Sequence, residues 1–169
     1  MTVSLEKSPG GASEASLQAL EAELGVSLPS AYREFLLRSD GGTPEPNQFS
    51  IPGLAEASGV NEFLSGRQIM SERHTRRHRL PAAIIPIGYA EGGNLVCLKV
   101  PEGDILFWDH ELEGKPGGLV RLAEGFDAFW RDLSRFSIHD VELSPDQVKS
   151  VWVDPDLLRT SRKKNPDKG

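Results

Sequence analysis

The chain has 169 residues and a net charge of −6, with 38% apolar and 26% charged residues. These values predict one soluble domain that buries about two-thirds of the surface exposed by its unfolded chain. A run of about 18 apolar residues and a signal-peptide start are both lacking, which argues against a membrane span and against secretion. Cys97 is the single cysteine, so no internal disulfide can form, and we expect a cytoplasmic protein.

In the first third of the chain, the sequence pattern predicts an arm followed by two helices. Residues 1–12 contain Ser, Pro and Gly and little apolar surface, which indicates a disordered arm. Three leucines share one face of a helix predicted over 13–24, and Gly25 is typical of the position after a helix. Pro29 suits the start of a second helix, which should end at the Asp40-Gly41-Gly42 turn.

The middle of the chain predicts strands around one further helix. Residues 49–51 favour a short strand, and 60–79 favour a helix that Gly66 weakens or divides. A strand over 84–87 then precedes a β-hairpin over 94–109, because β-branched and aromatic runs alternate with glycine-containing turns. Residues 119–122 favour another short strand.

The C-terminal third predicts an aromatic helix over 123–133, whose apolar stripe should meet the sheet. A strand over 138–143 and a helix starting at Pro145 are also expected. The tail at 156–169 is basic and should be mobile. The residues therefore indicate one α+β domain over 13–155, without an internal repeat.

No catalytic, metal-binding or cofactor motif stands out. Asp109, His110 and Glu111 could bind a metal or move protons, but neighbours in a strand point to opposite faces, so a solvated turn explains them better. His74 and His78 share a helix face but lie among arginines, which would repel a cation.

Three further candidates also have plain structural explanations. Cys97 could act as a nucleophile with His110, but both faces of its strand are apolar, which predicts a buried and inert thiol. The arginines at 73–79 and the basic tail lack interleaved aromatics, which argues against nucleic acid as a partner. The glycines at 92–93 form a turn rather than a phosphate loop, because a strand follows them.

Several segments in order resemble the SUKH superfamily of SMI/KNR-type domains. The resemblance spans about residues 13–135, and the residues after Leu133 lie outside it. Asp40 stands where Asn is common in that family, and Gly125 where Ser is common. The segments that carry the resemblance are Leu24–Leu36, Asp40–Gly42, Leu80–Pro81, Ile85–Gly88, Gly93–Leu98, Asp104–His110 and Leu122–Trp130.

This resemblance implies an α+β fold with a twisted, mostly antiparallel sheet packed against helices. It also implies a protein-binding module rather than an enzyme, and bacterial members commonly neutralise a toxin by direct contact. An acidic protein suits a basic partner such as a nuclease toxin. The expected partner-binding residues flank the hairpin: Glu91, Glu102, Asp104, Asp109 and Glu111.

Two other functions stay open from the sequence. The first is a regulatory scaffold like the fungal relatives of the family, which would bind host proteins without a toxin. The second is a small hydrolase, which would need Asp109, His110 and Cys97 to converge in one pocket.

Overall fold

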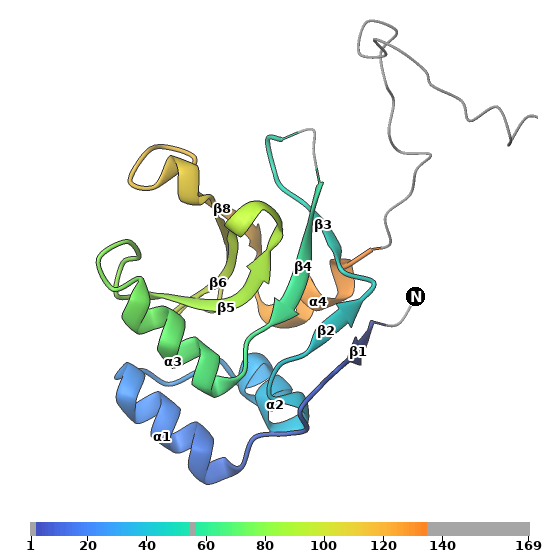
Figure 1. The fold of residues 1–169 in the computed structure, drawn as a ribbon, viewed down its shortest axis with the longest axis vertical. Coiled ribbons are helices and arrows are strands. Elements are labelled where there is room, and N and C mark those ends of the chain that lie inside the picture. Colours follow the sequence, from blue (N-terminus) through green and yellow to red (C-terminus); the bar gives the residue numbers. More distant parts are fainter. Residues whose placement is uncertain (1–2, 55–56, 135–169) are drawn as a thin grey trace, which may run out of the picture. The chain divides into compact units, whose positions relative to one another are not determined.

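The structure, a computed structural model, describes residues 3–54 and 57–134. Within these ranges the chain forms four α-helices and a mostly antiparallel six-stranded sheet, which confirms the α+β prediction (Figure 1). The helices are α1 (Glu14–Leu24), α2 (Ser30–Ser39), α3 (Gly66–Thr75) and α4 (Phe126–Asp132). The strand and helix predicted over 138–143 and after Pro145, the basic tail 156–169, and the end of the predicted domain 13–155 lie outside the described residues.

The large sheet is an antiparallel meander in which each strand pairs with its neighbours in the chain. Its order is β3-β4-β5-β6-β7-β8. Short turns can make such pairings, which is why the predicted hairpin at 94–109 is confirmed. The strands are β3 (Gln48–Ser50), β4 (Ala57–Phe63), β5 (Ile84–Ala90), β6 (Leu95–Lys99), β7 (Ile105–Trp108) and β8 (Leu119–Ala123).

The N-terminal segment differs from the disordered arm expected over 1–12. Residues Ser4–Glu6 form β1, which pairs antiparallel with β2 (Thr43–Glu45) in a separate two-stranded sheet. Val3 is buried in the core, and the backbone N–H of Ala12 donates to the carbonyl of Leu36 over 2.8 Å. A few apolar side chains and backbone hydrogen bonds therefore hold a segment whose composition suggested an arm.

The helix predicted over 60–79 is wrong at its start, and α3 also ends at Thr75, before the predicted end. Residues up to Phe63 belong to β4, and α3 starts at Gly66. Ser65 caps this helix, since its hydroxyl accepts from the N–H of Gln68, while the Gln68 side chain accepts from the N–H of Ser65 over 2.8 Å. This reciprocal pair fixes where the helix begins, so Gly66 stands at its start and not in its middle.

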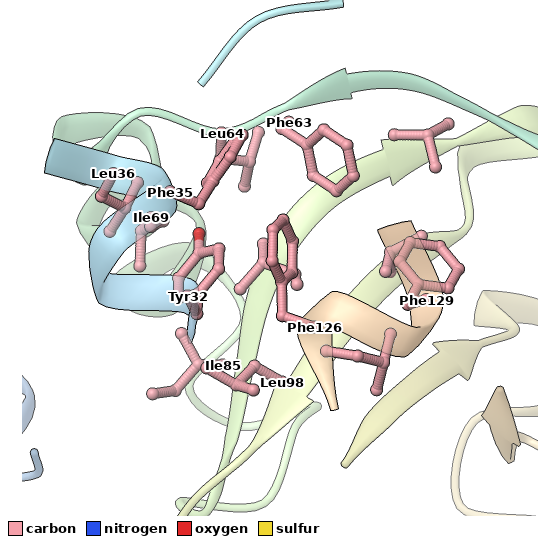
Figure 2. Packing of buried hydrophobic residues seen from close by; sticks show 14 of the residues in the cluster. Tyr32, Phe35, Leu36, Phe63, Leu64, Ile69, Ile85, Leu98, Phe126 and Phe129 are labelled. Atoms are coloured by element: carbon pink, nitrogen blue, oxygen red, sulfur yellow. The ribbon is translucent and has the colours of Figure 1, made fainter. Parts of the chain in front are cut away.

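One face of the sheet is covered by helices and holds the main core. Aromatic rings from α2 and α4 pack against Phe63 at the end of β4 (Figure 2). Phe126 and Phe129 are buried as the predicted stripe requires, and Trp130 packs against them partly buried. Burial of such side chains supplies the main driving force for folding.

The opposite face holds a smaller apolar cluster. Leu95 and Cys97 belong to it, whereas Val96 and Leu98 belong to the main core. This division confirms that β6 is a central strand covered on both faces. The other members of the small cluster are Leu80, Ile84, Leu106 and Trp108.

The thiol of Cys97 should therefore be unreactive in the folded protein. Its side chain is fully buried, and burial raises the pKa of this thiol well above its usual range. We expect a thiol-reactive dye to label native protein at least about 100-fold more slowly than protein in denaturant. Absorbance during labelling measures both rates, and similar rates in the two conditions would contradict the burial.

Candidate protein-binding surfaces

The five acidic residues expected to bind a partner lie at two opposite ends of the hairpin. Leu95 pairs with Trp108, and Leu98 pairs with Ile105. Glu91 precedes the first pair and the residues from Asp109 to Glu111 follow it, so they share one end of β6 and β7. The turn between these strands, with Glu102 and Asp104, lies at the other end. The structure therefore does not join the five carboxylates into one patch.

The carboxylates of the β6–β7 turn are compensated by basic side chains. Asp104 accepts from both Nε and an Nη atom of Arg121, at 3.0 and 2.7 Å. The ammonium of Lys99 lies 3.2 Å from Glu102. A backbone N–H of Glu102 itself and the Lys99 ammonium lower the pKa of the Glu102 carboxyl. Both carboxylates of this turn are therefore paired within the chain, and Arg121 also lies 3.5 Å from Glu124.

The other end carries the acidic group that we call the acidic end: Glu91, Asp109 and Glu111. Glu91 and Glu111 are exposed, and none of the three makes an ion pair with another residue in the described ranges. Asp109 accepts from the N–H of Glu111 over 2.9 Å. Asn94 accepts from the backbone N–H of His110 over 3.2 Å and lies 2.9 Å from its Nδ1. The two turns are thus tied together, while Glu91 and Glu111 are exposed and Asp109 is half-buried.

The catalytic arrangement considered for a hydrolase is not assembled here. Cys97 is enclosed in the small apolar cluster and pairs with Leu106 in the sheet. His110 lies beyond the end of β7 and is held by Asn94. Across residues 3–54 and 57–134, no group of three His, Cys, Asp or Glu side chains could hold a metal. The helices in these ranges are also too short or too polar to cross a membrane.

A pocket of about 370 Å³ opens beside the acidic end, between the residues that follow α3 and the loop before β8. We call it the Arg79 pocket. Arg79 lies over the ring of Trp108, with 5.0 Å between the guanidinium carbon and the ring centroid, and pairs with Glu113. The pocket is lined by Arg79, Pro81, Trp108, Gly114–Gly118 and Leu119.

The sequence predicts no site at these pocket residues, and the arginines at 73–79 stand out there only as basic groups without interleaved aromatics. The contact between Arg79 and Trp108 joins residues far apart in the chain, and no local spacing indicates it. The one hint in the sequence is that an arginine run and a Trp at a strand end are both present, since Arg side chains often stack on Trp rings.

A protein-family model for the SMI1/KNR4 family (SUKH-1) matches residues 11–132. The chain belongs to this family. It is also similar to the SPbeta prophage-derived uncharacterized protein YokK of Bacillus subtilis (strain 168), with 28% identity over 164 residues that cover 84% of each chain. The resemblance drawn from the sequence is thereby confirmed.

In this SMI1/KNR4 chain the Asp40-Gly41-Gly42 signature is structural. Asp40 has a left-handed backbone with φ 37°, and its carboxylate accepts from the N–H of Gly66 over 2.8 Å. It thereby satisfies a free donor at the start of α3. Gly42 exchanges two backbone hydrogen bonds with Phe63. The signature therefore joins the end of α2 to the junction of β4 and α3.

This geometry suits either Asp or Asn at position 40. Both residues tolerate the left-handed region and offer a side-chain oxygen to Gly66. We expect Asp40→Asn to change the free energy of unfolding by less than about 0.5 kcal/mol, and Asp40→Ala to lower it by about 1–2 kcal/mol. Urea unfolding followed by circular dichroism measures both, and equal losses in the two variants would contradict the role of the side-chain oxygen.

Proposed function

We propose that this protein is a cytoplasmic immunity protein that neutralises a basic toxin domain by binding it through the acidic end. The observation that carries the proposal is the contrast between the two ends of the hairpin. Asp104 and Glu102 are compensated within the chain, whereas Glu91 and Glu111 face solvent without a basic partner in the described residues.

The local structure suits such contacts. The acidic end consists of two turns joined by Asn94, so its carboxylates are presented on a hydrogen-bonded support. Pre-positioned charges lose less conformational freedom on binding, and clustered negative charge accelerates the approach of a basic protein. Nuclease toxins carry basic surfaces that contact phosphates, and they are therefore a fitting partner class.

The comparisons support this proposal. Membership in the SMI1/KNR4 family agrees with a module that works through protein contacts. The similar Bacillus protein is named as prophage-derived and uncharacterized, so its name assigns no enzymatic activity. Binding, rather than chemistry on a substrate, also agrees with the enclosed Cys97 and the tethered His110.

Co-expression with the toxin encoded beside the gene tests the proposal. We expect the wild-type chain to restore growth, and a variant with Glu91→Gln, Asp109→Asn and Glu111→Gln to fail. The matched control removes three exposed carboxylates from the helices instead, and it should still restore growth: Glu23→Gln, Glu34→Gln and Asp127→Asn. Wild-type protein that neither binds the toxin nor restores growth would reject an immunity role. Binding to host proteins instead would favour a regulatory scaffold.

A further inference from the structure

The Arg79 pocket has chemistry opposite to that of the acidic end. Arg79 and Lys115 supply positive charge, and Pro81, Pro116 and Leu119 supply apolar walls. Its volume of about 370 Å³ is in the range of sites that hold a small ligand or a few side chains of a partner. An anionic group next to an apolar one is therefore the matching chemistry.

Arg79 already holds a carboxylate from this chain. Its guanidinium pairs with Glu113, and the two side chains are 42% and 32% exposed. Arg79 stacks over the Trp108 ring, which orients its guanidinium before any ligand arrives. Arg76 also lies over this ring. The contact with Glu113 indicates that Arg79 is placed to bind a carboxylate.

The loop that carries Glu113 contains several glycines. Gly114 and Gly117 have positive φ values of 68° and 87°, and at Gly114 no heavy atom lies within 4 Å of the place that a Cβ atom would occupy. A partly exposed carboxylate on such a loop can leave Arg79 at small cost, since a solvated ion pair contributes little to stability.

The rim of the pocket is apolar and continues into the outer edge of β8, which no described strand covers. Leu112 and Leu119 are 37% and 39% exposed, and they are two of the three exposed large apolar side chains within the described residues. Leu119 is also the first residue of β8, the last strand of the sheet, and no described strand pairs with the outer edge of β8. An unpaired edge offers backbone groups to an extended segment.

We propose that the Arg79 pocket binds an extended segment of a protein partner in which an acidic residue lies beside a large apolar one. The partner carboxylate replaces Glu113 on Arg79, and the apolar side chain enters the pocket against Pro81 and Leu119. This proposal does not rest on the immunity role, because the pocket and the acidic end carry opposite charge and recognise different groups.

Selection from a displayed library of random heptapeptides on the full-length chain tests the proposal. We expect enrichment of peptides with Asp or Glu beside a large apolar residue. For a selected peptide, Arg79→Gln should weaken binding at least about tenfold, since it removes a charge-assisted contact. Glu113→Gln should strengthen binding about two- to fivefold, because it removes the internal competitor.

Arg121→Gln is the matched control, because Arg121 is also an exposed arginine paired with a carboxylate on this sheet. It should leave the affinity unchanged. The gain from Glu113→Gln is a readout that a misfolded variant cannot give. Failure to enrich acidic–apolar peptides, equal losses with Arg79→Gln and Arg121→Gln, or weaker binding with Glu113→Gln would overturn the proposal.

Discussion

Gly41→Ala should lower the free energy of unfolding by about 3 kcal/mol or more. Gly41 has φ 96°, a backbone conformation that residues with side chains rarely adopt. A Cβ atom here would lie 2.7 Å from the carbonyl oxygen of Phe63 and 2.9 Å from the backbone nitrogen of Ser65. Both neighbours are backbone atoms at the junction of β4 and α3, so relief of the clash requires movement of the junction itself. Urea unfolding measures the loss.

Gly25→Ala measures the cost of a left-handed backbone without a steric clash, and it therefore serves as the control for Gly41→Ala. Gly25 also has a positive φ, 69°, but a Cβ atom at this position would have no heavy atom within 4 Å. We therefore expect a loss of only about 1 kcal/mol from the left-handed conformation. Similar losses at Gly41 and Gly25 would show that the close approach of the Asp40-Gly41-Gly42 turn to Phe63 is not what holds this junction.

Phe63→Ala should lower the free energy of unfolding by about 3–5 kcal/mol. The ring is fully buried and contacts four other aromatic rings, from α2 and α4, at centroid distances between 5.3 and 6.4 Å. Figure 2 labels Phe35, Phe126 and Phe129 among them. Its removal leaves a cavity where the two helices meet the sheet, which cannot close without movement of both helices. The same urea titration measures this loss.

Leu54→Ala is the control for Phe63→Ala. Leu54 is 59% exposed, so its truncation should change the free energy of unfolding by less than about 0.5 kcal/mol. A loss at Phe63 below about 1.5 kcal/mol would contradict a single aromatic core that binds α2 and α4 to the sheet.

Much of the fold can be predicted from local patterns. The helices at 14–24 and 30–39, and the strands of the hairpin, carry their own periodicity and their own glycine or proline boundaries. The segment from Ala57 to Thr75 shows where such patterns fail. Its apolar residues fit a helix as well as a strand, and only the Ser65–Gln68 cap reveals that a strand ends before the helix starts.

The candidate site was predictable only in part. The sequence indicates that acidic residues flank the hairpin, but not which of them stay uncompensated. Arg121 neutralises Asp104 across the β7–β8 pair, and Arg79 finds Glu113 in a distant loop. Such pairs depend on register and on loop packing, which composition and spacing do not contain. The division into an acidic end and a basic pocket therefore emerges only with the fold.

The most direct measurement is the dissociation constant between the purified protein and its proposed partner, a toxin domain to be sought in the gene beside its own. Isothermal titration should give tight binding that weakens as salt rises. Neutralisation of Glu91, Asp109 and Glu111 together should weaken it at least about 100-fold, since each lost charge contact contributes on the order of 1 kcal/mol or more. An unchanged dissociation constant in that variant, with the helix-surface control also unchanged, would contradict the acidic end as the partner-binding surface.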